Sequence, residues 1–338
     1  MIKKYYIFAL LFSFLISDQL KAQHYQFSQF YAAPTYLNPA FTGANVCSRI
    51  SINYRNQWNT IPGGFTTYQV TADHSLKKLN SGIGVQFFND RAGVGGLKTT
   101  QVNLLYAYDI RINKTYGARA GISVGGVQRS IDYSSLVFGD QIARGGSATT
   151  LDNISIQRKF YIDMAAGGLF YNSTWWVGFA ANHLTRPDQS LQGNTSALPM
   201  ELKLHGGYKF MFDGDESNGS KNNPNRNNII VTANYKKQAK FNQLDLGLYY
   251  SKNYLVMGVW YRGLPFFKPV PDYRNNDAMI FIVGVAVEKF KIGYSYDVTI
   301  SKLTNVSSGG THEISLSYQF CDQKRKKKRN ILISCPKF

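Results

Sequence analysis

From residue 47 onward, apolar and polar side chains alternate along short segments of the chain. In the stretch SRISINYRNQW, which begins at Ser48, Ile50 and Ile52 take one face, and Arg49 and Arg55 take the other. A period of two residues is typical of a β-strand with one apolar and one polar face. Such strands suit a transmembrane barrel that meets lipid outside and water inside, although the strands of a soluble β-sandwich alternate in the same way.

Segments of this kind recur along the chain and are separated by turn residues. We predict about 14 strands, near residues 47–58, 66–74, 81–89, 97–110, 116–129, 160–171, 175–184, 201–212, 228–237, 243–250, 255–262, 278–287, 290–297 and 310–321. An even number of antiparallel strands closes a barrel with both chain ends at the periplasmic rim.

The lengths of the connections favour the barrel over the sandwich. If the first strand runs outward, most periplasmic connections are short (SLKKLN, RINKT, NST, SKN, EK), with one long exception, DGDESNGSKNNPNR. The external connections include the long segments 130–159 and 185–200. Short periplasmic turns and long external loops are typical of outer-membrane barrels. We therefore predict an all-β fold, a transmembrane antiparallel β-barrel over residues 47–321.

The N-terminus has the features of a secretory signal peptide over residues 1–22. Lys3 and Lys4 precede an apolar run from Tyr5 to Ile16, and Ala22 stands before Gln23. This run is shorter than the roughly 20 residues of a spanning helix, which indicates cleavage rather than anchoring. We expect an exported chain that begins near Gln23.

Residues 23–46 fit neither a strand nor a helix. The stretch QFSQFYAAPTYLNPAFTG has irregularly spaced aromatic residues, and Pro34 and Pro39 would interrupt a helix. Because it precedes the first strand, we place it on the periplasmic side and expect it to fold into the barrel lumen as a plug. A disordered leader is the alternative. The candidate plug residues are Gln26, Phe27, Phe30, Asn38, Pro39 and Gly43.

Three charged residues on polar strand faces meet where the barrel would close. Arg55 is on the first strand, Asp297 on the thirteenth and Glu313 on the fourteenth, all near the external rim. We expect them to form a charge cluster in the lumen, where opposite charges are weakly screened. The alternative is three separate solvated charges.

The composition adds many aromatic residues and a strong positive charge. The chain has 22 Phe, 23 Tyr and 4 Trp, and 38 Lys plus Arg against 20 Asp plus Glu, a formal net charge of +18. Such a charge suggests a polyanionic partner, but export makes nucleic acid an unsuitable one. The basic residues culminate in a C-terminal tail, residues 322–338, that contains Lys324, Arg325, Lys326, Lys327, Lys328 and Arg329. We expect a solvated tail, or one that contacts anionic lipid or an acidic periplasmic partner.

No pattern of catalytic, cofactor-binding or metal-binding residues stands out, so we predict no enzyme and no cofactor. Leu316 occupies the position of the second histidine that a zinc-protease motif beginning at His312 would need. Of the three cysteines, Cys47 and Cys321 fall at the same end of the predicted seam and could pair. A bond between Cys321 and Cys335 is the competitor, and three free thiols are slightly favoured.

Four sequence blocks carry a resemblance to a known family. QFSQFYAAPTYLNPAFTG, then YRNQW from Tyr54, then GYSYDVTISKL from Gly293 and GGTHEISLSYQF from Gly309 resemble, in that order, the PorP/SprF family of type IX secretion outer-membrane proteins. The insertion at 213–227, the long third external loop and the basic extension beyond Phe320 depart from the family pattern. The resemblance implies an outer-membrane barrel that serves the secretion and gliding machinery or holds a large surface adhesin.

With this resemblance, we expect a protein that docks or anchors an exported adhesin or its C-terminal domain. The expected partners are outer-membrane lipid, an exported type IX cargo or adhesin, and a periplasmic lipoprotein of the machinery if the chain is instead a core component linked to the motor. A passive diffusion porin is the other alternative. Exposed aromatic residues beside arginine suit a protein interface, so the external contact candidates are segment 130–159 and, in the loop GLPFFKPVPDYRNND, Phe266, Phe267, Tyr273 and Arg274.

Overall fold

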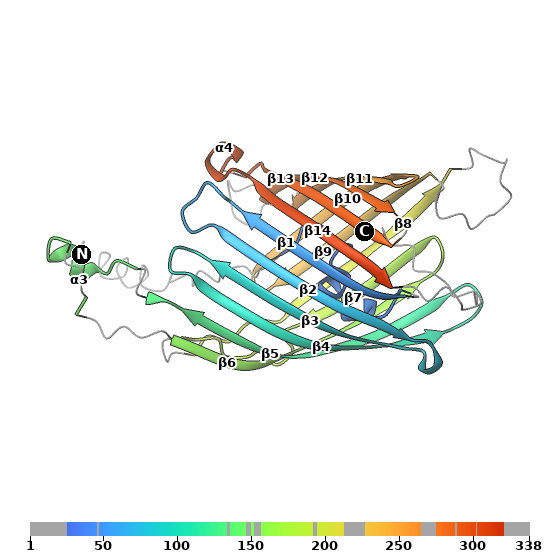
Figure 1. Ribbon diagram of the computed structural model, residues 1–338, viewed down its shortest axis with the longest axis horizontal. Helices are drawn as coiled ribbons and strands as arrows, with labels where there is room; N and C mark the ends of the chain where they lie inside the picture. Colours follow the sequence, from blue (N-terminus) through green and yellow to red (C-terminus); the bar gives the residue numbers. More distant parts are fainter. Residues whose placement is uncertain are drawn as a thin grey trace, which may run out of the picture.

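The protein folds into one closed antiparallel β-barrel of 14 strands (Figure 1). The computed structural model describes residues 26–45, 47–133, 136–146, 150–151, 157–191, 195–212, 227–264, 275–287, 289–301 and 303–320. Every strand is hydrogen-bonded to its sequence neighbours, and β14 pairs with β1 to close the sheet. The predicted fold class and strand count are confirmed.

The strand bounds follow the predicted segments closely. They are β1 Ser48–Gln57, β2 Phe65–Leu76, β3 Ser81–Ala92, β4 Leu97–Arg111, β5 Gly117–Ile131, β6 Gln157–Tyr171, β7 Trp175–Asn182, β8 Glu201–Met211, β9 Asn228–Gln238, β10 Phe241–Lys252, β11 Leu255–Leu264, β12 Asn275–Val287, β13 Phe290–Thr299 and β14 Thr311–Phe320. We call the rim at which odd-numbered strands end the loop end, and the opposite rim the turn end. The short helices α3 (Gly139–Ala143) and α4 (Asn305–Ser308) belong to loop-end connections, and the 3-10 helix η2 (Lys77–Leu79) to a turn-end connection.

The barrel has a polar interior and an apolar exterior. On β1, Ile50 and Ile52 are 38% and 43% exposed, whereas the alternate residues Ser51 and Asn53 are buried. This arrangement inverts that of a soluble domain and matches a barrel surrounded by lipid. Over the described residues, no helix is long and apolar enough to cross a membrane.

The wall of the barrel is uneven in height. Strands β4, β5 and β6 have 15 residues each, whereas β7 has 8. Consequently β6 pairs with β7 only over Ala166–Tyr171, although it pairs with β5 along its whole length. At the closing seam, by contrast, β1 and β14 pair from Ser48 and Phe320 to Gln57 and Thr311.

The cysteine at the start of the barrel is not a free thiol. Cys47 is disulfide-bonded, so the slight preference for three free thiols is wrong. Its chain neighbour Ser48 pairs with Phe320, the last residue of β14. The other two cysteines, Cys321 and Cys335, lie outside the described residues. A covalent bond therefore supplements the hydrogen bonds near the turn end of the chain's first strand.

Candidate functional site

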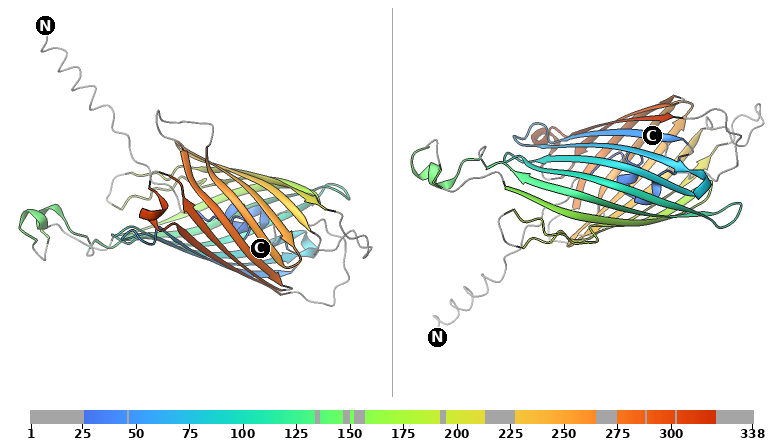
Figure 2. Two further views of the ribbon diagram at one scale, coloured as in Figure 1. Left: turned by 90° about the horizontal axis from the view of Figure 1, so that it is seen from above. Right: turned by 60° about the horizontal axis from the view of Figure 1, so that its bottom comes forward.

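The barrel encloses the chain segment that precedes β1. This luminal segment, Gln26–Gly43, contains the short helix α2 (Pro34–Leu37) and the 3-10 helix η1 (Pro39–Phe41), and nearly all of its residues are buried. Figure 2 shows it from two sides as the blue chain inside the strands. The structure places all six candidate plug residues of the sequence analysis in this segment.

The local fold of the luminal segment follows from its prolines and Asn38. Pro34 and Pro39 each stand in the first turn of a short helix, where a missing N–H costs little. Asn38 caps η1, because its Oδ1 accepts a hydrogen bond of 2.9 Å from the Ala40 N–H. Its Nδ2 donates to the carbonyl oxygens of Gly168 and Phe179 on the wall, at 3.0 and 2.9 Å. One side chain therefore both starts a helix and fixes it to β6 and β7.

The luminal segment runs between the two rims. Gln26 accepts a hydrogen bond of 3.0 Å from Lys236, which lies two residues before the loop end of β9. At the other end, the Gly43 N–H donates to Asp73 near the turn end of β2, at 2.9 Å. The sequence predicts a segment that starts on the periplasmic side and folds into the lumen, and in the structure its first residue, Gln26, lies in the loop-end half of the lumen.

Arg55, Asp297 and Glu313 lie together in the lumen. The Arg55 guanidinium contacts the Asp297 and Glu313 carboxylates at 3.0 and 3.1 Å, and all three residues are at most 2% exposed. A second arginine, Arg262 of β11, contacts Asp297 at 3.3 Å and Asp245 of β10 at 3.0 Å. Alternation and the order of the strands could have placed Arg262 and Asp245 opposite each other on the luminal face, but not the contact of Arg262 with Asp297, two strands further on.

The luminal segment takes part in this charge cluster. The backbone N–H groups of Ser28 and Gln29 donate to the Glu313 carboxylate at 2.7 and 3.0 Å. The Ser28 hydroxyl donates to Asp297 at 2.5 Å and accepts from Arg55. Sequence reasoning missed Ser28 and Gln29, because nothing in a non-repeating segment indicates which strand it will meet. The Glu313 and Asp297 carboxylates thus bind both the luminal segment and the arginines.

Aromatic side chains pack the rest of the segment against the turn-end half of the wall. Tyr31 lies with its ring centroid 5.6 Å from that of Trp176, and Phe30 lies 5.2 Å from Trp260, both in edge-on contacts. The Tyr31 hydroxyl also bonds to the Thr232 hydroxyl at 2.6 Å. These rings belong to the larger of the two apolar clusters among the described residues. The core of this barrel is therefore made by the luminal segment and not by the wall alone.

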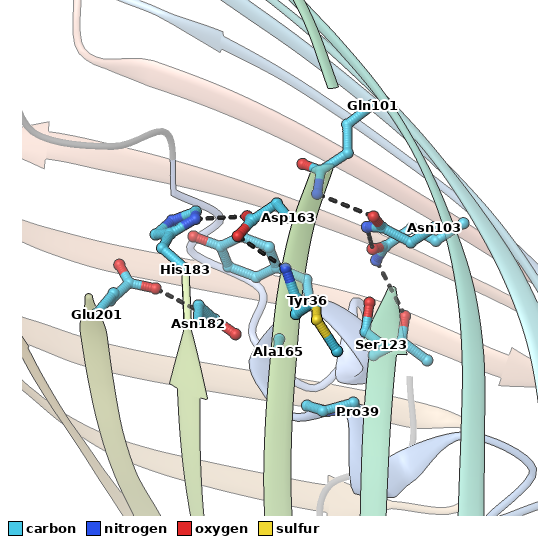
Figure 3. A pocket seen from close by; sticks show the side chains of 13 residues that line it. Tyr36, Pro39, Gln101, Asn103, Ser123, Asp163, Ala165, Asn182, His183 and Glu201 are labelled. Atoms are coloured by element: carbon cyan, nitrogen blue, oxygen red, sulfur yellow. Dashed lines mark hydrogen bonds and ion pairs between the residues drawn. The ribbon is translucent and has the colours of Figure 1, made fainter. Parts of the chain in front are cut away.

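A polar pocket lies between the luminal segment and strands β3 to β8 (Figure 3). It is lined by Thr35, Tyr36, Pro39, Gln86, Gln101, Asn103, Ser123, Asp163, Met164, Ala165, Asn182, His183 and Glu201. His183 Nδ1 lies 2.6 Å from the Asp163 carboxylate, and Asn182 donates to Glu201 at 2.9 Å. Amides, hydroxyls and carboxylates suit a polar group rather than an apolar one. The described residues contain no group of three His, Cys, Asp or Glu side chains placed to hold a metal ion.

Several predicted features fall outside the described residues. They are the predicted signal peptide at residues 1–22, the external loop candidates Phe266, Phe267, Tyr273 and Arg274, and the basic tail residues from Lys324 to Arg329. These remain predictions.

Comparison with known proteins identifies both a family and a fold. The model of the family described as Type IX secretion system membrane protein PorP/SprF matches residues 19–318. The toluene transporter TbuX of Ralstonia pickettii is similar in structure, with a TM-score of 0.52 and 12% identity over 85% of this chain and 93% of that chain. The monoaromatic hydrocarbon channel CymD has a TM-score of 0.50 and 12% identity over 86% and 93%. These structural likenesses show the fold alone. No curated protein sequence matches the chain significantly.

Proposed function

The chain belongs to the PorP/SprF family of type IX secretion membrane proteins, and we propose that it is a docking component that holds an exported adhesin, or its C-terminal domain, at the cell surface. The family and the barrel fold make it an outer-membrane protein of this secretion system. The docking role is our inference, and it makes the loop end the side that meets the exported protein.

The filled lumen is the observation that carries this proposal. A passive diffusion channel needs a continuous aqueous path, whereas here the luminal segment crosses the lumen between Lys236 near one rim and Asp73 near the other. The charge cluster holds it through the buried Glu313 and Asp297 carboxylates. A barrel filled in this way supports a function performed by its surfaces and rims rather than by free diffusion through its centre.

Single-channel conductance tests the plugging role of the luminal segment. We expect the purified protein to conduct poorly in a planar bilayer, and deletion of residues 24–43 to open large, stable channels. A second variant, Phe30→Ala with Tyr31→Ala, keeps the backbone and should raise conductance less. Heat-modifiable electrophoretic mobility verifies that each barrel is folded. Large channels in the unaltered protein would favour the diffusion porin.

Exchange of the loops tests docking. Replacement of residues 132–156, the part of segment 130–159 that lies between β5 and β6, or of the loop around Phe266 and Tyr273 with short Gly/Ser turns should release the exported protein from the cell surface into the medium. Site-specific cross-linking from these loops, followed by mass spectrometry, should identify an exported protein. If the loops are dispensable and cross-links from the turn end capture a periplasmic lipoprotein, the chain is instead a core component linked to the motor.

A further inference from the structure

One strand of the barrel has a free edge at the loop end. β6 pairs with β5 from Gln157 to Tyr171, but β7 covers its other edge only from Ala166 to Tyr171. Among the described residues, the part of β6 from 157 to 165 therefore pairs with a strand on one side only. Figure 1 shows β6 among the long strands that extend towards the loop end, and its neighbour β7 is much shorter.

The connection after β7 covers only part of this edge. The Leu184 N–H donates to the Met164 carbonyl at 3.0 Å, and the Thr185 hydroxyl donates to the Ile162 carbonyl at 3.1 Å. Because backbone groups point alternately to the two sides of a strand, those of Phe160 and Arg158 point to the same side as those of Ile162 and Met164. In the described part of the chain, no backbone group bonds to Phe160 or Arg158 across that side.

Two further described residues of the β7–β8 connection bond to luminal side chains instead of to this edge. Asp188 accepts a hydrogen bond from Lys159 at 3.0 Å, and Gln189 accepts one from Arg129. Lys159 and Arg129 alternate with the outward-facing residues of their strands, so they belong to the luminal face. Hydrogen bonds from the Ser196 backbone N–H and, to a lesser extent, from Lys159 lower the pKa of Asp188 to about 2. This carboxylate therefore remains charged at neutral pH. The described residues of this connection therefore leave the edge of β6 at Phe160 accessible.

The free edge begins where the apolar band of the barrel ends. Outward-facing Ile162 lies opposite Gly126 on β5, which lies opposite Val102 on β4 in an apolar row. One row nearer the loop end, Phe160 lies opposite Gln128, which lies opposite Thr100. Since unpaired backbone groups are not tolerated in hydrocarbon, a free edge is expected at this polar row and not below it. The edge at Arg158 and Phe160 therefore faces the interface or water.

We propose that the edge of β6 at Arg158–Phe160 receives one β-strand of the exported protein, which pairs with it and extends the wall above β7. This inference rests on the proposed docking function and specifies how the partner is held. An exposed strand edge is a template for an added strand, and main-chain hydrogen bonds then provide the attachment. Phe160, 67% exposed, supplies an apolar contact beside those bonds.

Charge favours an exported protein over a second copy of the chain as the occupant. Arg158 is exposed on the outer face of the edge, and the whole chain has a formal net charge of +18, so two copies repel each other. A strand with carboxylates beside its apolar positions would be attracted to the same edge. Lipid chains cannot take the place of such a strand, because they offer no hydrogen-bond partner for backbone N–H groups.

Photo-cross-linking in intact cells tests the position of the partner. A photoreactive residue at Phe160 should cross-link to an exported protein within a predicted strand of its C-terminal region. The matched control is Asn89, which lies opposite Thr100 in the same outer row but on β3, a strand paired on both sides. Cross-links at Asn89 as strong as those at Phe160, or cross-links from Phe160 to a second copy of this chain or to lipid only, would overturn the inference.

Proline substitution tests the hydrogen bonds themselves. Phe160→Pro removes an N–H that the barrel does not use, and Phe160→Ala removes the ring but keeps that N–H. With the cross-linker at Arg158, Phe160→Pro should lower the yield of the exported-protein adduct about tenfold, the effect of losing about 1.4 kcal/mol of binding. Phe160→Ala should lower it less. Equal yields for the two variants would contradict strand addition.

The outcomes also separate this inference from the proposed function. If the exported protein cross-links to the loops but never to Arg158 or Phe160, docking stands and strand addition at β6 is wrong. If no exported protein cross-links at any loop-end position, both are wrong. Heat-modifiable mobility confirms that every variant compared forms a folded barrel.

Discussion

Two junctions of the same barrel, β14–β1 and β6–β7, differ in how much of their length is paired by backbone hydrogen bonds. Ten residue pairs join β1 to β14, and only six join β6 to β7. Behind the first junction, Arg55 and Glu313 bind each other and the luminal segment. Beside the second, a loop replaces strand pairing from His183 onward.

The difference shows how one sheet combines a fixed interior with an open edge. Buried charges are tolerated only if each is held in good geometry, so a cluster such as Arg55 with Glu313 needs a complete and rigid wall behind it. Recruitment of a partner strand needs backbone groups that the protein itself leaves unused, as at Phe160. The two requirements are met on different sides of the barrel.

Removal of Arg55 should reduce the stability of the barrel most, because Arg55 joins β1 to β14 on the luminal side of the complete junction. Arg55→Met leaves the buried Glu313 carboxylate without its arginine, and the barrel should lose about 3–5 kcal/mol of stability. The thermal unfolding midpoint in detergent, followed by heat-modifiable mobility, measures this loss. Arg144→Met is the control, because Arg144 pairs with Asp140 in a solvent-screened loop contact, whose loss should hardly change the midpoint. Equal losses would mean that the luminal cluster has no special role in stability.

Proline at neighbouring positions of β6 sharpens the comparison at the incomplete junction. The N–H of Tyr161 points towards Val127 on β5, so Tyr161→Pro should cost about 3 kcal/mol or more. Phe160→Pro should cost less than about 1 kcal/mol of barrel stability, because its N–H has no ladder partner. The same mobility assay measures both. If both variants are destabilised alike, the edge of β6 is not free.

The smallest expected effect concerns the turn end of the luminal segment. Gly43 has a φ of +63°, and a Cβ there would lie 2.6 Å from Cα of Gly82. Gly43→Ala should therefore cost about 1–3 kcal/mol. Gly139→Ala is the control, because a Cβ at Gly139 meets nothing within 4 Å. An unchanged midpoint for Gly43→Ala would show that the segment yields easily at this rim.

Much of the barrel was predictable because its information is local and has a period of two. The alternation that begins at Arg49 and Ile50 assigns a luminal and a lipid face to each strand, so Arg55, Asp297 and Glu313 could be placed on the luminal face before their distances were known. The path of the luminal segment could not be predicted in this way. Its prolines exclude long regular elements, but they do not indicate that Ser28 would meet Glu313, 285 positions away.

The sequence by itself therefore determined the strands, their two faces, the closed barrel and the resemblance to the PorP/SprF family, since alternation and connection length are properties of neighbouring residues. Only the tertiary structure decided that Gln26 lies towards the loop end, that Arg262 joins the charge cluster and that β7 stops short of β6. These features depend on which distant backbone and side-chain groups meet across a closed lumen. The energy of such contacts is set by their geometry in the folded barrel and not by any local pattern.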